Sequence, residues 1–248
     1  MSLSELPITG LPVDQVSPSV IVCGDPARAD QIAARLNDGR LISNRREYRA
    51  YRGTYQDKAI TVCSHGVGAP GAAVAFEELI IAGAQRILRV GTCGGLQPDI
   101  QTGQLIIATA AVQNTGYGRE TAPEGYPAVA DLVLTQTLRQ AAETAGHSIR
   151  AGIVLSRDNF YAGVPAPAAP DYRVMSQARV LAVEMECAAL FVVGSLRGIA
   201  TAAILAVDGN VLEASESVET YRPGQEVVHR AVESAIELAL ESSWTVML

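Results

Sequence analysis

Two carboxylates two positions apart interrupt an otherwise apolar segment, and they are the residues of this chain best placed to do chemistry. Glu184 and Glu186 lie within residues 180–193, where nearly every other side chain is hydrophobic. An unpaired buried charge is very costly, so hydrogen-bond donors must satisfy both acids. Side chains two apart share one face of an extended backbone, so this pair could grip a sugar diol. The alternative is that one or both acids pair with buried arginines in the core.

Arginines beside glycine-rich junctions suggest that the sugar has an anion as its neighbour. Gly24 comes directly after the first apolar run, and Arg28 lies four residues further on, where a helix is expected to begin. In this pattern the first amides of the helix and the arginine guanidinium can hold a phosphate. Arg89 interrupts a second apolar run, which leads into a glycine-rich turn containing Thr92. Taken alone, the turn from Gly24 to Arg28 more often has a purely structural explanation. Arg89 alone could equally well neutralise an acid. Their joint occurrence favours one site, because ligands of open α/β sheets bind beyond the carboxyl ends of strands.

Further polar residues follow other apolar runs. Asp208 comes directly after residues 201–207 and is a candidate general acid, because burial beside a ligand would raise its pKa and let it donate a proton near neutrality. The alternative is an aspartate that caps the next turn, a common use before glycine. Residues 64–71 form a glycine-rich turn suited to close approach by a ligand, although its His65 has a structural explanation. The basic residues 44–49 are by default a solvated surface strand.

Short apolar runs alternate with helical patterns, which indicates an α/β fold with helices on both faces of a largely parallel sheet. Strands are expected at residues 20–23, 60–63, 87–90, 105–108, 153–155 and 201–207, and helices at 28–36, 71–81, 131–145, 186–196 and 224–240. The two long connections, residues 114–129 and 162–171, are rich in Gly, Pro and Ala. Connections of that length are typical of active-site lids.

Composition narrows the class of protein. The chain has 248 residues, 48% hydrophobic and 18% charged, which suits one domain spanning residues 1–248. Its net charge of -7 and scattered basic residues argue against nucleic-acid binding. The four cysteines and three histidines are dispersed, so we expect reduced thiols, no metal site and no cofactor. The sequence shows neither a targeting segment nor an apolar run of membrane-spanning length, so we expect a cytoplasmic protein that does not bind membranes.

Five ordered motifs together resemble the purine nucleoside and uridine phosphorylases of the hexameric, trimer-of-dimers class. They are the turn from Gly24 to Arg28, Arg46-Glu47-Tyr48, Arg89-Val90-Gly91-Thr92-Cys93-Gly94-Gly95, Val183-Glu184-Met185-Glu186 and Val207-Asp208-Gly209. The resemblance runs almost end to end. It implies a single-domain, three-layer α/β phosphorylase fold with a mixed, partly barrel-like central sheet. It also implies a homo-oligomer, a hexamer or a dimer, whose active sites are shared across a dimer interface.

The resemblance also implies roles for individual residues. The phosphate ligands would be Gly24, Arg28, Arg89, Thr92 and, supplied to the neighbouring subunit's site, Arg46. At the sugar, Glu186 would bind the ribose hydroxyls, Met185 would pack on the ring, and Glu184 would line the side toward the base. At the base, Phe160 and Tyr161 would form the wall of the pocket. Asp208 would protonate the purine. The catalytic residues would then be Asp208 and Arg89. Phosphate, as co-substrate, would cleave the nucleoside to free base and ribose 1-phosphate.

Departures from the family pattern bear on the substrate. Residues 6–9, Leu-Pro-Ile-Thr, replace a histidine that reaches a neighbour's sugar 5′-hydroxyl in the family, so a 5′-deoxy or 5′-modified nucleoside becomes a candidate. Residues 162–165, Ala-Gly-Val-Pro, lack the Gln and Arg with which uridine phosphorylases bind uracil. A purine is therefore the first choice and uridine the alternative. Further alternatives are a nucleosidase that uses water, a non-catalytic nucleoside-binding domain and, more weakly, a dinucleotide-binding oxidoreductase.

Overall fold

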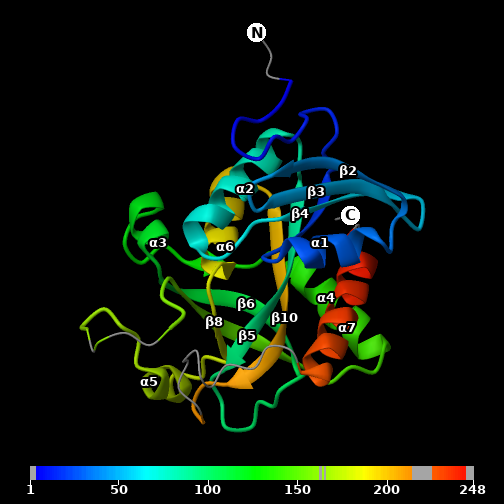
Figure 1. The fold of residues 1–248 in the computed structure, drawn as a ribbon. Coiled ribbons are helices and arrows are strands. Elements are labelled where there is room, and N and C mark those ends of the chain that lie inside the picture. Colours follow the sequence, from blue (N-terminus) through cyan, green and yellow to red (C-terminus); the bar gives the residue numbers. More distant parts are fainter. Residues whose placement is uncertain (1–3, 162–163, 165, 214–224, 244–248) are drawn as a thin grey trace.

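The computed structural model describes residues 4–161, 164, 166–213 and 225–243, which form one sheet flanked by helices (Figure 1). The strands of the described part are β1 Ser19–Cys23, β2 Asn37–Arg45, β3 Tyr48–Tyr55, β4 Lys58–Ser64, β5 Arg86–Gly95, β6 Leu105–Asn114, β7 Ala128–Val129, β8 Ile149–Arg157, β9 Ala182–Glu184 and β10 Ala200–Asn210. The helices are α1 Pro26–Ala33, α2 Ala69–Ile81, α3 Gly116–Thr121, α4 Leu132–Thr144, α5 Tyr172–Gln177, α6 Cys187–Arg197 and α7 Glu226–Ser242.

The sheet closes on itself over part of its width. Its strand order is β10-β6-β8-β9-β5-β1-β4-β3-β2, and β10 also pairs with β5, so that β5, β9, β8, β6 and β10 form a closed ring. The expected mixed, barrel-like sheet is thus confirmed. The largely parallel sheet expected from the apolar runs alone is wrong, because β9 runs antiparallel to β5, β6 antiparallel to β10, and β2 and β3 extend the edge as an antiparallel pair. β2 gave no apolar signal because its side chains are exposed or half-buried.

Two apolar cores cover the faces of the sheet (Figure 1). The core under α2 and α6 includes Phe76 and Phe191, and the core under α1, α4 and α7 includes Ile32, Leu138 and Ile236. The five expected helices are present with ends shifted by about two residues, except that Gly224, where the last was expected to begin, lies outside the described residues.

The two long connections contain short elements that the sequence reading missed. Residues 114–129, expected as an open lid, contain α3 and β7. The α3 turn is stabilised by the Thr115 side chain, which accepts a hydrogen bond from the Gly118 amide. The connection 162–171 leads into α5, whose first amides bond to Asp171, while residues 162, 163 and 165 lie outside the described part.

The glycine-rich segment after Arg89 is strand and not the expected turn. It forms the last part of β5, in which Gly94 and Gly95 pair with β9 and β10. A Cβ on Gly94 would lie 2.5 Å from Val211 Cγ1, and one on Gly95 would lie 2.7 Å from Ile100 Cγ2. These glycines therefore allow close packing on both sides of a strand. The sequence alone does not distinguish a glycine needed for close packing from one needed for a turn.

No helix within the described ranges is long and apolar enough to cross a membrane. Across the same residues, no group of three or more His, Cys, Asp or Glu side chains is arranged to hold a metal ion. All four cysteines are buried and free of disulfides.

Candidate active site

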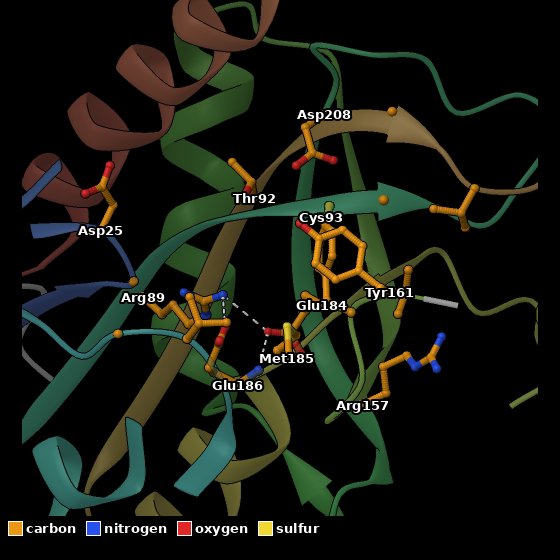
Figure 2. A pocket seen from close by; sticks show the side chains of 18 of the residues that line it. Asp25, Arg89, Thr92, Cys93, Arg157, Tyr161, Glu184, Met185, Glu186 and Asp208 are labelled. Carbon is orange, nitrogen blue, oxygen red and sulfur yellow. Dashed lines mark hydrogen bonds and ion pairs between the residues drawn. The ribbon is translucent and has the colours of Figure 1, made fainter. Parts of the chain in front are cut away.

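A cavity of about 760 Å³ lies at the carboxyl ends of β1, β5 and β9 and beside the end of β10 (Figure 2). Ten of the eleven residues predicted for the site line it: Gly24, Arg28, Arg89, Thr92, Phe160, Tyr161, Glu184, Met185, Glu186 and Asp208. Residues from five separate parts of the chain therefore converge on one space. The exception is Arg46.

Arg89 is held between the two glutamates in the wall of this cavity (Figure 2). Its Nη2 lies 2.5 Å from Glu186 Oε2 and 3.4 Å from Glu184 Oε2, and all three side chains are buried. Burial is the largest influence on the pKa of Arg89 and lowers it, but the contributions of Glu186, Cys187 and Glu184 together outweigh burial and keep the pKa above its usual value. Burial raises the pKa of Glu186, and the Arg89 charge opposes the rise. The sequence left open whether the two glutamates pair with a buried arginine. In the structure they do pair with Arg89, and the ion pair borders the cavity.

The two glutamates do not share one extended backbone, because β9 ends at Glu184 and Glu186 is the residue preceding α6. The Glu184 carboxylate accepts hydrogen bonds from the amides of Glu186 and Cys187 and from the Ser156 hydroxyl. Ser156 Oγ in turn accepts from the Ala188 amide. A carboxylate at a helix N-terminus is stabilised by the helix dipole. Glu184 therefore anchors the start of α6 and holds Glu186 in place, a positioning role that sequence reasoning missed.

Glu186 is also tied to the glycine-rich turn after β4. Its Oε1 accepts a hydrogen bond of 2.6 Å from the Gly68 amide. Gly68 has a φ of +95° and Gly66 a φ of +74°, conformations that favour glycine. The turn thus lies at the site and binds a protein carboxylate, while its predicted approach to a ligand stays a prediction.

Asp208 enters the cavity from a bulge in β10. Val207 pairs with Cys93 and Gly209 with Gly94, so Asp208 is an additional residue between two ladder positions. Such bulges re-aim a side chain, and Figure 2 shows the half-buried Asp208 directed toward the hollow between Thr92 and Tyr161. The expectation that Asp208 follows the end of its strand is wrong, because pairing with β5 continues to Asn210.

Two aromatic side chains, Phe160 and Tyr161, form another part of the cavity wall. Phe160 and Tyr161 pack edge to face with ring centroids 5.0 Å apart, and Tyr161 is 48% exposed. Arg157, to which the sequence reading gave no role, also lines the cavity on the Tyr161 side and donates a 2.5 Å hydrogen bond to the Tyr172 hydroxyl. Asn159, Asn210 and Val67 were likewise missed as lining residues, since isolated polar or apolar residues after strands carry no distinctive signal.

Arg46 lies outside the cavity of its own chain. It occupies the turn between β2 and β3 with a φ of +57°, and its side chain is exposed. The neighbouring Glu47 packs on Gly66, whose absent Cβ would lie 2.8 Å from Glu47 Cγ. This turn therefore lies beside the edge of the cavity, although its arginine does not line the cavity.

Comparison with known proteins identifies the family. A model described as the phosphorylase superfamily matches residues 18–242. The chain belongs to this superfamily. It is 38% identical to the uridine phosphorylase of Treponema pallidum, over 94% of this chain and 91% of the relative, and 36% identical to the purine nucleoside phosphorylase of Plasmodium vivax, over 92% and 91%. The solved structure of the Toxoplasma gondii purine nucleoside phosphorylase in complex with immucillin-H matches with a TM-score of 0.91 and 34% identity, covering 98% of this chain and 96% of that one.

These matches confirm the expected family, the fold and the enzyme class, a nucleoside phosphorylase of the pentosyltransferase type. The relatives include enzymes named for purine and for pyrimidine nucleosides at nearly equal identity. The choice of base must therefore be argued from the cavity itself.

Proposed function

We propose that this chain cleaves the N-glycosidic bond of purine nucleosides with inorganic phosphate, giving the free base and ribose 1-phosphate. The observation that carries this proposal is the cavity in which Arg89 and Glu186 form a buried pair beside Thr92, Asp208 and the aromatic wall. Cations for an oxyanion, acids for a sugar and a half-buried acid for a base are thereby gathered in one space.

The proposed mechanism divides the cavity into three parts. Gly24, Arg28, Arg89 and Thr92 hold the phosphate, which attacks the anomeric carbon. Glu186 binds the ribose hydroxyls and Met185 packs against the sugar, so the two reactants meet in a fixed orientation. Fixed charges stabilise the oxocarbenium character that the sugar acquires. Asp208 donates a proton to the base as the glycosidic bond breaks, and the base departs from the part of the cavity beside Phe160 and Tyr161.

The preference for a purine rests on Asp208 together with the sequence that follows Tyr161. A carboxylic acid directed into the base side of the cavity suits protonation of a purine ring nitrogen. Residues 162–165 offer no Gln or Arg for uracil. A turnover panel over inosine, guanosine, adenosine, uridine and 5′-methylthioadenosine at saturating phosphate tests this preference. We expect the highest kcat/KM for a purine nucleoside, and a higher value for uridine would overturn the preference while leaving phosphorolysis intact.

A nucleosidase that uses water is the second candidate, and phosphate dependence separates the two. Arg28 and Arg89 both line the cavity, and the buried glutamates account for Arg89 alone, whereas a phosphate nucleophile would use both cations. We therefore expect base release to require phosphate and to yield ribose 1-phosphate.

The N-terminal segment bears on the sugar 5′ position. Its Ile8 and Thr9 amides and the Thr9 hydroxyl all donate to the buried Glu78 carboxylate on α2, at 3.0, 2.7 and 2.6 Å. The segment is thus fixed on the body of the protein, and it presents Ile8, which is 39% exposed, where the family pattern has a polar contact. We propose that 5′-deoxy and 5′-methylthio analogues of inosine are turned over with a higher kcat/KM than inosine. Equal or lower values would remove this proposal.

We further propose a homo-oligomer, a hexamer in preference to a dimer, in which Arg46 completes the neighbour's phosphate site. The exposed position of Arg46, outside its own cavity, supports this arrangement. Mixing Arg46→Gln subunits with Asp208→Asn subunits should restore activity, because some sites would then receive both native residues. Absence of activity in refolded mixtures whose subunits are shown to exchange would contradict sharing.

We expect the assembly to act in the cytoplasm, where buried free thiols stay reduced.

A further inference from the structure

His65 is a fully buried polar residue that has no role in the proposed phosphorolysis mechanism. It directly follows β4, and its amide donates a 2.8 Å hydrogen bond to the Cys23 carbonyl at the end of β1. The next amide, that of Gly66, donates to the Gly24 carbonyl at 3.0 Å. His65 is therefore fixed beside the Gly24 turn, with its side chain beneath Arg89.

The hydrogen bonds of the ring define its protonation state. Its Nδ1 lies 2.9 Å from the Gly66 carbonyl oxygen, which only accepts, so Nδ1 carries the hydrogen. Nε2 lies 3.3 Å from Arg89 Nη1. Because a guanidinium only donates, Nε2 of the neutral ring is the acceptor. Phe76 packs edge to face on the ring, with centroids 5.4 Å apart, and limits its rotation.

The surroundings keep this ring uncharged. Burial lowers the pKa of His65 well below its usual value, and the positive charges of Arg89 and Arg28 lower it further. A protonated imidazole would turn an N–H toward the Arg89 guanidinium 3.3 Å away and would place two cations in contact. His65 thus offers Arg89 an acceptor without adding charge.

Three contacts together define where the Arg89 guanidinium lies. Glu186 accepts a hydrogen bond from Nη2, and His65 accepts one from Nη1. Gly91 provides the surface beneath the group, since a Cβ there would lie 2.8 Å from Arg89 Cζ. Without the His65 acceptor, nothing would hold Nη1 against the pull of the acids on Nη2, and the guanidinium would be drawn toward them.

We propose that His65 is a positioning residue whose uncharged ring holds the Arg89 guanidinium in the orientation from which it binds the phosphate co-substrate. This inference rests on the proposed function, because it needs Arg89 to be a phosphate ligand. A hydrogen bond to a charged group contributes enough binding energy for its loss to weaken phosphate binding by roughly 10- to 100-fold. Nucleoside binding, which depends on other contacts, should change much less.

Two substitutions separate the acceptor from the bulk of the ring. His65→Met fills the space with a thioether, which accepts hydrogen bonds only weakly, whereas His65→Gln keeps an amide oxygen near the position of Nε2. We expect His65→Met to raise the phosphate KM by roughly 10-fold or more, with less than about a 3-fold change in the nucleoside KM, and we expect His65→Gln to recover most of the loss. His229→Met, on the exposed side of α7, is the matched control and should behave as the wild type.

The outcomes distinguish this inference from the function on which it rests. If wild-type base release does not depend on phosphate, the proposed function itself fails. If it does, and His65→Met and His65→Gln leave the phosphate KM unchanged or shift it equally, the role of His65 is overturned. Nitrogen NMR of wild-type protein with labelled histidine is independent of how the variants fold. It should show His65 as the neutral tautomer protonated at Nδ1 at pH 7, with a shift change on adding phosphate. A cationic ring or the Nε2-protonated tautomer would contradict the proposal.

Discussion

Arg89 Nη2 and Glu186 Oε2 lie 2.5 Å apart in the wall of the cavity, and their side chains are only 4% and 6% exposed. One ion pair thus joins the residue proposed for phosphate and the residue proposed for ribose. Desolvation makes such a pair costly to form, and removing one partner leaves an uncompensated buried charge. The two substrate subsites therefore share a structural element as well as a space.

Arg89→Met should strongly destabilise the protein, because Glu184 and Glu186 would then be buried without their cation. We expect a loss of about 3–5 kcal/mol in the free energy of unfolding, measured by urea denaturation at fixed protein concentration. The matched control is Arg197→Met, which removes the exposed ion pair with Glu77. Exposed pairs contribute little, so this variant should lose far less. Similar losses in the two variants would show that burial does not determine the energetics of the Arg89 pair.

Asp208→Asn should slow the chemical step while leaving the phosphate site intact. Loss of a general acid typically costs about 100-fold or more in turnover. We expect kcat for inosine to fall by at least that factor, with the phosphate KM within about 3-fold of wild type. Asp99→Asn, which removes a carboxylate paired with Arg150 at the surface, serves as control. Unchanged turnover by Asp208→Asn would remove Asp208 from the acid role.

Gly91→Ala should displace the Arg89 guanidinium from its place over β5. The added Cβ would lie 2.8–2.9 Å from Cζ and both terminal nitrogens, closer than real Cβ atoms approach other groups. We expect a raised phosphate KM with the secondary structure retained by circular dichroism. In Gly116→Ala the new Cβ meets only Asp158 Oδ2, at an ordinary 3.5 Å, and turnover should be unaffected. A wild-type phosphate KM in Gly91→Ala would show that the guanidinium does not need this surface.

The buried His65 predicts how stability depends on pH. Burial lowers its pKa in the folded state well below the unfolded value of 6.5. Below pH 6.5 the unfolded chain therefore binds a proton that the folded protein does not, so stability falls as the pH falls, by up to about 1.4 kcal/mol per pH unit. Urea unfolding between pH 7 and pH 5 should show a steeper loss for wild type than for His65→Gln. Parallel losses in both proteins would contradict a neutral buried His65.

Much of the site was predictable because its chemistry occurs in short motifs with unusual composition. Acids at 184 and 186 and an arginine at 89 stand out within apolar runs, and such interruptions are visible without coordinates. The alternation of strands and helices likewise predicted the α/β class and the two covered faces of the sheet.

The contacts that position those residues depend on distant parts of the chain. Glu184 anchors α6 through Ser156, which is 28 residues away, and nothing in either local sequence indicates the pairing. The bulge at Asp208 lies in the pairing of β10 with β5, two residues beyond the last β10 residue that pairs with β6. Neither the closed ring of strands nor the exposed strand β2 could be predicted from local sequence patterns, because register and closure are properties of the whole sheet.

Release of base from inosine as a function of phosphate concentration, with the sugar product analysed, tests the central claim most directly. We predict that release saturates with phosphate, is negligible when phosphate is removed, and yields ribose 1-phosphate in equal amount to hypoxanthine. Release of base at the same rate without phosphate, with free ribose as the product, would contradict an oxyanion site at Arg89 beside the sugar.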